Sequence, residues 1–268
     1  MFYHAKNDKL KMGNTDMDYI SFGSGKKNLI LIPGLGDGLH TVKGTALPFA
    51  FMYRKFAKEY RVYAFSRKNR LEEGYTTRDM ARDQKNAMEQ LGIEKADIVG
   101  VSQGGMIAQH MAIDYPEAVN KLVLTVTVPR VNETIEKVVG NWIRLATQEK
   151  YKEIQIDTAE KMYSEAYLRK YRWMYPILGA VGKPKEFSRF IIMANACLTH
   201  NAYEKLDKIN MPCFIIGGKK DEIVGGEASE EIAEKIKNSK LYMYENYGHG
   251  LFEEAGDFNQ KIMEFLKE

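Results

Sequence analysis

Residues 96–105 read ADIVGVSQGG, an apolar run that leads into Ser102 and then into a pair of glycines. The apolar run is typical of a strand buried on both faces of a sheet. Residues 103–115 are suited to a helix, which must end before Pro116. Ser102 is therefore predicted to lie in a sharp turn between a strand and a helix.

Strands and helices alternate on both sides of this turn. We expect strands at 28–32, 61–65, 96–101 and 121–126, with helices at 46–59, 77–91 and 103–115. Thr76 and Asp79 have the spacing of a capping box, which indicates where the second helix begins. We expect a second run of strand, helix, strand and helix at 213–217, 227–237, 240–244 and 252–267. This alternation predicts an α/β fold with a doubly wound, mostly parallel sheet.

A long insertion interrupts the alternation. About 80 residues separate the strand at 121–126 from the strand at 213–217, whereas a plain crossover needs about a dozen. Residues 130–205 are rich in helix formers and aromatic side chains, among them Trp142, Trp173 and Phe190. We therefore expect a core domain at 1–129 and 206–268, with a helical cap or lid at 130–205.

Residues 100–104, GVSQG, match the pattern GxSxG. Average composition produces this pattern by chance in roughly one chain of this length in ten, so its setting carries the argument. A sharp turn lifts the serine hydroxyl above the sheet, and glycines on either side leave room for the turn. We interpret Ser102 as a nucleophile and the Gln103 backbone N–H as a donor to an oxyanion. The alternative is a serine that only caps the helix.

Residues 33–38, PGLGDG, follow the strand at 28–32, where a second oxyanion donor is needed, and the Leu35 N–H is our candidate. A nicotinamide-binding fold is a rival interpretation, because a glycine loop and then Arg67 also suit NADP. Against it, the third glycine of GxGxxG would fall on Leu39, and no acidic residue closes the next strand. The loop could also simply make a tight turn.

Asp221 and His249 follow the strands at 213–217 and 240–244, at the sheet edge where ligands bind in open α/β folds. We interpret Asp221 as the acid that orients His249, and His249 as the general base. His40 is the main competitor for the base and Glu222 for the acid, and Asp221 could instead cap a loop turn. The remaining rivals are predicted to lie away from this edge: His4, His110, His200, Asp97, Asp207 and Asp257.

The composition limits the classes of binding partner that we expect for this chain. The chain carries 39 Lys and Arg against 36 Asp and Glu, a net charge of +3 without long charge runs, so we expect no nucleic-acid or membrane partner. We find no signal-peptide pattern and no stretch of about 18 apolar residues, so we expect a cytoplasmic protein. Cys197 and Cys213 lack metal or redox spacing and are expected to be reduced structural thiols. We expect no metal and no cofactor.

The sequence resembles the α/β-hydrolase superfamily over most of its length. The matching segments, in order, are NLILIPGLGD, TRDMARDQKNAMEQLGIEKADIVGVSQGG, MAIDYPEAVNKLVL, MPCFIIGGKKDEIV and YGHG. The resemblance implies the same roles for Ser102, Asp221 and His249, and for the N–H groups of Leu35 and Gln103. The sequence departs from the family at Pro33, where many members have a histidine before the oxyanion glycine.

These features predict a serine hydrolase, carboxylesterase-like, that cleaves an ester or related acyl bond of a small hydrophobic substrate through an acyl-enzyme. The same triad serves thioesterases, acyltransferases, lactonases and carbon–carbon bond hydrolases, and a poorly catalytic receptor could keep the same fold. We further expect the cap to form an apolar pocket over Ser102.

Overall fold

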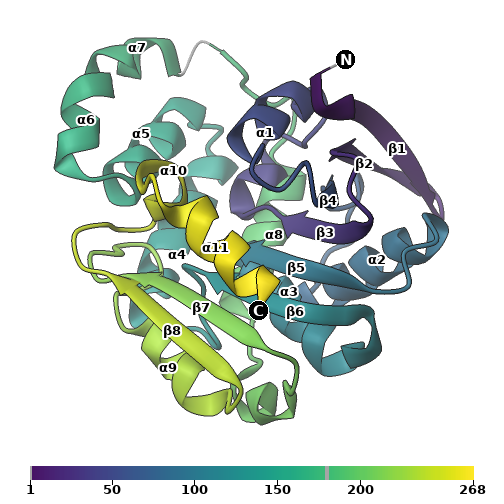
Figure 1. Cartoon of the computed structure of the whole chain (residues 1–268). Coiled ribbons are helices and arrows are strands. Elements are labelled where there is room, and N and C mark those ends of the chain that lie inside the picture. The colour runs from purple at the N-terminus through teal and green to yellow at the C-terminus, as the bar shows by residue number, and fades with distance from the viewer. Residues whose placement is uncertain (1, 179–180) are drawn as a thin grey trace.

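The computed structural model describes residues 2–178 and 181–268. Its centre is one sheet of eight strands in the order β1-β2-β4-β3-β5-β6-β7-β8, drawn in Figure 1. The strands are β1 Lys6–Met12, β2 Thr15–Phe22, β3 Lys27–Ile32, β4 Tyr60–Phe65, β5 Ala96–Val101, β6 Val119–Thr125, β7 Cys213–Gly218 and β8 Ser239–Tyr244. The strands β4, β3, β5, β6, β7 and β8 pair in parallel with their neighbours in this order. Strand β2 is antiparallel to both of its neighbours, β1 and β4. The predicted doubly wound, mostly parallel sheet is confirmed.

Helices cover both faces of the sheet. The helices are α1 Ala46–Met52, α2 Thr77–Gln90, α3 Gln103–Asp114, α4 Glu133–Thr147, α5 Tyr151–Met162, α6 Glu165–Tyr171, α7 Tyr175–Leu178, α8 Ser188–Leu198, α9 Ala228–Lys235, α10 Leu251–Glu254 and α11 Phe258–Lys267. Buried side chains of α2, α3 and α9 join one apolar core, and those of α1 and α11 join the other. On β5, Ile98 enters the first core and Val99 the second, which explains the continuous apolar run in the sequence.

Three elements differ from the sequence-based expectation. The polar N-terminus forms the hairpin β1–β2, in which Met12 pairs with Thr15 across a turn at Gly13. The helix expected at 46–59 ends at Met52, and turns then bring Tyr53 and Phe56 into the core. The helix expected at 252–267 is divided into α10 and α11, because Ala255 adopts an extended backbone between them.

The segment between β6 and β7 contains the helices α4 to α8. In Figure 1, α5, α6 and α7 lie at the upper left, outside the sheet. Helices α1 and α10 lie on the same side of the sheet. Helix α8 lies against the loop that follows β3, where a Cβ on Gly38 would be 2.9 Å from Phe190 Cα. The inserted helices therefore pack next to the loop in which the sequence places Leu35. Residues 179–180, within the predicted cap, and Met1, within the predicted core domain, lie outside the described residues.

Candidate active site

Ser102 connects β5 to α3 with a backbone that non-glycine residues rarely adopt. Its φ is 55° and its ψ is −121°. Its N–H donates to Thr125 O at 2.9 Å, and its carbonyl accepts from Thr127 Oγ1 at 2.8 Å. A Cβ on Gly104 would lie 1.9 Å from Ile32 O, so this position has no room for a side chain. Hydrogen bonds to the end of β6 and to the residues just after it, with close packing against β3, hold Ser102 in its strained geometry.

Asp221 and His249 come from the loops after β7 and β8, two strands that are neighbours in the sheet. His249 Nδ1 lies 2.8 Å from Asp221 Oδ2, and both side chains are buried. The second carboxylate oxygen, Asp221 Oδ1, accepts from the N–H groups of Ile223 and Val224 at 2.8 and 2.9 Å. If Nδ1 of the neutral imidazole donates to Asp221, Nε2 keeps the lone pair that can accept a proton.

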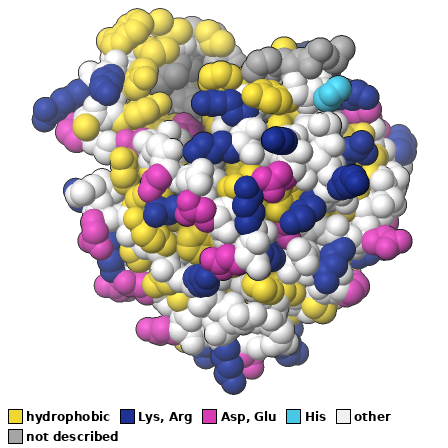
Figure 2. Space-filling view, in the orientation of Figure 1, with side chains coloured by type: hydrophobic (Ala, Val, Ile, Leu, Met, Phe, Trp, Pro, Cys, Tyr) yellow, Lys and Arg dark blue, Asp and Glu magenta, His cyan; other side chains and the backbone are white. Residues whose placement is uncertain are grey.

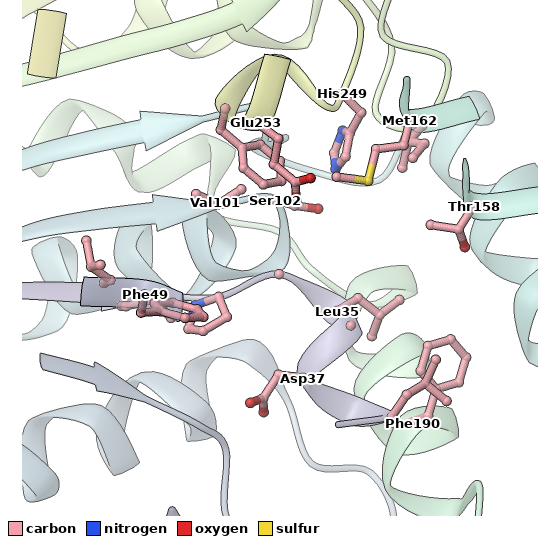
Figure 3. A pocket seen from close by; sticks show the side chains of 18 of the residues that line it. Leu35, Asp37, Phe49, Val101, Ser102, Thr158, Met162, Phe190, His249 and Glu253 are labelled. Atoms are coloured by element: carbon pink, nitrogen blue, oxygen red, sulfur yellow. The ribbon is translucent and has the colours of Figure 1, made fainter. Parts of the chain in front are cut away.

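Ser102 and His249 line the same pocket, which has a volume of about 360 Å³. Figure 3 draws His249 and Ser102 along one side of the pocket, with Leu35 and Phe190 on another side. No hydrogen bond joins Ser102 Oγ to His249 Nε2 among the bonds of the described residues. Such contacts are often loose in the absence of substrate and tighten when it binds.

Leu35 and Gln103, the two expected oxyanion donors, each occupy the first position of a helix: Leu35 starts the 3₁₀ helix Leu35–Gly38, and Gln103 starts α3. At this position a backbone N–H has no partner within the helix. The loop before Leu35 packs onto the serine, because a Cβ on Gly34 would be 3.3 Å from Ser102 Cβ. Both N–H groups therefore lie close to Ser102 and form no hydrogen bond within their own helices.

The comparisons with known proteins agree with this geometry. The family model described as "alpha/beta hydrolase fold" matches residues 27–256. The chain belongs to the α/β-hydrolase family. A 2-hydroxy-6-oxononadienedioate/2-hydroxy-6-oxononatrienedioate hydrolase of Paraburkholderia phymatum is 26% identical over 282 residues, which cover 95% of this chain and 92% of the relative. Epoxide hydrolase 1 of Caenorhabditis elegans is 24% identical over 288 residues, covering 96% and 69%.

Solved structures show the same fold. An alpha/beta hydrolase enzyme from a Medee basin deep-sea metagenome library superimposes with a TM-score of 0.86, at 21% identity, over 97% of this chain and 98% of that chain. The enol-lactonase of Burkholderia xenovorans gives a TM-score of 0.83 at 16% identity, over 97% and 100%. With its family established, the protein is an α/β hydrolase.

The rival residues of this hydrolase lie elsewhere. Of the described histidines, only His249 lines the pocket that contains Ser102. His40 Nε2 instead lies 2.9 Å from Tyr151 Oη, and His200 Nδ1 lies 3.0 Å from Thr77 Oγ1. Asp97 is at the opposite end of β5 and accepts from Tyr60 Oη, while Glu222 is exposed. Among the described candidates, the structure brings together only Ser102, Asp221 and His249.

Sequence reasoning missed a buried ionic network behind the oxyanion loop. Arg67 is 1% exposed, and its Nη2 donates to Pro33 O at 2.5 Å and to Gln103 Oε1 at 3.0 Å. Burial lowers the pKa of Arg67 to about 10, a lowering that neighbouring Asp37 opposes. Arg189 of α8 reaches the same carboxylate, with Nη2 2.6 Å from Asp37 Oδ2. Arg67 therefore braces the loop and is not accessible for the phosphate of a nucleotide.

The pocket wall is mostly apolar. Its side chains come from the core and from the inserted helices, the latter contributing Trp142, Ile154, Gln155, Thr158, Met162 and Phe190. Among the described residues, no lysine or arginine lines it, and its two carboxylates are Asp37 and Glu253. Such a wall suits an uncharged or cationic ligand better than an anionic one.

Three further observations concern residues 2–178 and 181–268 only. No cluster of three or more His, Cys, Asp or Glu side chains in them could hold a metal ion. None of their helices combines the length and apolar character needed to span a membrane. Cys197 and Cys213 are both buried and unpaired, and burial raises the pKa of both thiols.

Proposed function

We propose that this hydrolase cleaves a carboxylic ester or a related acyl bond of a small substrate through an acyl-enzyme on Ser102. The observation that carries the proposal is the pair His249–Asp221, with its 2.8 Å contact, facing a serine with φ of 55° in one apolar pocket. Ser102 Oγ attacks the carbonyl carbon while His249 Nε2 takes its proton. The N–H groups of Leu35 and Gln103 stabilise the oxyanion. The intermediate then loses its leaving group, which takes the proton back from His249, and the acyl-enzyme remains. Water, activated by His249, attacks the acyl-enzyme and releases the acid and free Ser102.

We also propose that residues 130–205 act as a cap. Trp142, Met162 and Phe190 from the inserted helices line the pocket together with residues of the core. Their apolar surface would exclude bulk water from the acyl-enzyme and hold an apolar acyl chain. The volume of about 360 Å³ is at the small end for ligand pockets, which supports a small substrate.

Carbon–carbon bond hydrolysis is the second candidate, because several relatives at 24% to 27% identity are named as hydrolases of 2-hydroxy-6-oxo dienoates or dienedioates. A dienedioate carries two carboxylates, which bind best to paired cationic groups. The described residues that line this pocket offer Asp37 and Glu253 but no lysine or arginine. We therefore favour acyl-bond hydrolysis for this chain.

One experiment separates the two candidates. Purified protein is given nitrophenyl esters of increasing acyl length and, separately, 2-hydroxy-6-oxononadienedioate, and Ser102→Ala is tested on each. We expect kcat/KM for a short ester to exceed that for the dienedioate by at least tenfold, with both rates dependent on Ser102. Faster turnover of the dienedioate would reverse our choice. A metal requirement, seen as loss of activity with EDTA and recovery with zinc, would contradict the proposed chemistry.

A further inference from the structure

Glu253 is a carboxylate in the pocket wall that the proposed chemistry does not use. It lies in α10, four residues after His249, and lines the same pocket as Ser102. Figure 3 draws Glu253, Ser102 and His249 in the same part of the pocket. Its carboxylate is therefore available to a substrate that Ser102 attacks.

The two pocket carboxylates differ in how their charge is balanced. Asp37 has Arg189 Nη2 at 2.6 Å and Arg67 Nη1 at 3.9 Å. Glu253 accepts a hydrogen bond from Tyr163 Oη at 2.7 Å but forms no ion pair with a described residue. Arg54 and Lys55 line a shallow outer hollow that Glu253 also borders, without pairing with it. The pocket consequently carries one negative charge that the described protein does not neutralise.

One aromatic side chain contacts this carboxylate, and others line the same pocket. Phe49, Tyr53 and Phe252 line the pocket with it, and Tyr163, which donates to it, stacks on Tyr167 with ring centroids 4.4 Å apart. Aromatic faces attract cations, and quaternary ammonium groups are typically bound among them. A carboxylate in an apolar pocket that aromatic rings also line suits a bulky organic cation, whereas a carboxylate ligand would be repelled.

We propose that Glu253 binds a cationic ammonium group on the substrate and thereby selects cationic acyl esters over anionic ones. This inference rests on the proposed acyl hydrolysis at Ser102, because it assigns the far end of the same substrate. The cation neutralises the carboxylate only when substrate is bound. Glu253 is a specificity residue in this scheme, and Ser102, His249 and Asp221 carry out the chemistry.

The pH dependence has a definite sign. Part of the Glu253 side chain is exposed, but desolvation of its carboxyl in the pocket wall raises the pKa of that carboxyl; the Tyr163 hydroxyl lowers this pKa, and Glu254 raises it further. Glu253 is charged above this pKa and neutral below it. The preference for a cation is therefore present near neutral pH and is lost as the pH falls, and the loss begins at a higher pH than for an ordinary glutamate.

The test uses three nitrophenyl esters of similar shape. One has a trimethylammoniobutanoyl group, the second its uncharged carbon isostere dimethylhexanoyl, and the third an anionic glutaryl group. For the wild-type protein we expect kcat/KM to fall in that order. Glu253→Gln should lower kcat/KM for the cationic ester about tenfold, equivalent to about 1.4 kcal/mol, and change the value for the uncharged ester less than twofold.

Two control variants separate charge from structure. Tyr163→Phe removes the hydroxyl bond to Glu253 but keeps the charge, so the cation preference should persist. Glu153→Gln removes one negative charge from an exposed position of α5 beside pocket-lining Ile154, and should leave all three rates unchanged. A tenfold loss in Glu153→Gln equal to that in Glu253→Gln would assign the preference to the general field of the protein and overturn the inference.

The outcomes distinguish this inference from the proposed function. The ratio of kcat/KM for the cationic ester to that for the uncharged ester could be the same in wild type and in Glu253→Gln, with hydrolysis still dependent on Ser102. That result would overturn the role of Glu253 but leave the proposed function standing. If no ester is hydrolysed, the proposed function fails, and calorimetry still decides the cation site. The probes are trimethylammoniobutanol and its uncharged isostere dimethylhexanol. Glu253→Gln should weaken only the first about tenfold, and equal weakening of both, or of neither, would contradict the inference.

Discussion

Asp221 shows how single residues set the geometry of the site. Its Oδ1 accepts two backbone N–H bonds from its own loop, which leaves Oδ2 for His249 Nδ1. Hydrogen bonds of this kind fix the orientation of the carboxylate, so that Oδ2 points at His249. The neighbouring Glu222 is exposed and forms none of these contacts. The two acids are thus adjacent in sequence but differ sharply in what they touch.

Asp221→Asn and Glu222→Gln test this difference. We expect Asp221→Asn to fold and to lower kcat by about 10⁴-fold, because the amide favours the wrong tautomer of His249. Glu222→Gln is the matched control and should change kcat less than twofold. Steady-state kinetics, with thermal melting to check the fold, provides the measurement. The opposite ranking of the two variants would place the acid at Glu222.

At this scale, residues that belong to a local pattern could be predicted, and residues that depend on distant contacts could not. Ser102 was predicted because its strand, turn and flanking glycines are consecutive in the sequence. Arg67 was noted only as a feature of the rival nucleotide fold, since its bonds to Pro33 O and Gln103 Oε1 join segments more than 30 residues apart. Glu253 carries no sequence signal beyond its spacing from His249.

At the scale of elements, the contact between α3 and β3 sets how the turn at Ser102 packs against the loop at residues 33–38, which carries the Leu35 N–H. Gly104 in the first turn of α3 lies so close to β3 that a Cβ would be 1.9 Å from Ile32 O and 2.8 Å from Pro33 O. These are backbone atoms, which cannot rotate away. A side chain here must separate the helix from the strand and displace the loop that carries Leu35.

We therefore expect Gly104→Ala to destabilise the protein by at least about 2 kcal/mol and to lower kcat/KM about 100-fold or more in the folded fraction. Gly140→Ala in α4 is the matched control, because nothing lies within 4 Å of its Cβ position. A helix-interior glycine costs about 0.5–1 kcal/mol relative to alanine, so this variant should be slightly more stable. Urea unfolding and ester hydrolysis give both values. Equal behaviour of the two variants would contradict the packing argument.

Element boundaries were predictable where a local stop signal exists. Helix α2 starts at Thr77 after the capping box of Thr76 and Asp79, as expected, and ends one residue before Leu91. Helix α1 was predicted too long because its periodicity continues through Tyr53 and Phe56, which pack into the core from turns. The hairpin β1–β2 was missed because five of the seven β1 residues, Lys6 to Lys9 and Lys11, are polar and exposed, so the strand lacks an apolar run.

At the scale of the whole molecule, a buried pair of imidazoles connects α2, α3 and the segment that follows α8. His110 of α3 and His200, which follows α8, meet edge to face with centroids 5.1 Å apart. His200 also bonds Thr77 of α2. Burial lowers the pKa of His110 to about 4 and of His200 to about 3. Asp114 opposes the lowering of the His110 pKa, whereas Arg78 and Lys205 add to it.

The Val128 carbonyl opposes the lowering of the His200 pKa. Each imidazole would repel the other if both were charged.

These lowered pKa values predict acid instability. Well above pH 6.5 both imidazoles are neutral in the folded and the unfolded chain, so burying them carries no protonation penalty and the folded state keeps its full stability. As the pH falls toward 4, the unfolded chain takes up protons that the folded chain excludes, which costs about 1.4 kcal/mol per proton per pH unit. His200→Gln should reduce the slope of unfolding free energy against pH between 6 and 4.5 by about one proton. An unchanged slope, measured by urea unfolding, would refute this assignment.

The surface beside the pocket bears on how substrate enters. Figure 2 shows apolar side chains at the top of the view. Exposed large apolar side chains of the protein include Leu47 and Phe51 of α1 and Trp173 after α6. Lysines and glutamates interrupt the inserted helices, among them Lys152, Glu153 and Lys161. We expect kcat/KM to peak at short acyl chains and to show no jump where the ester forms an emulsion. Rates measured below and above the solubility limit test this, and a jump would indicate interfacial lipolysis.

The most direct measurement of the central claim is covalent capture of Ser102. Protein treated with a fluorophosphonate is analysed by mass spectrometry, and Ser102→Ala is assayed for ester hydrolysis in parallel. We predict a single adduct on the peptide that contains Ser102, and a fall in kcat of about 10⁴-fold or more in the folded variant. Labelling at another residue, or unchanged turnover in Ser102→Ala, would contradict the assignment of Ser102 as the nucleophile.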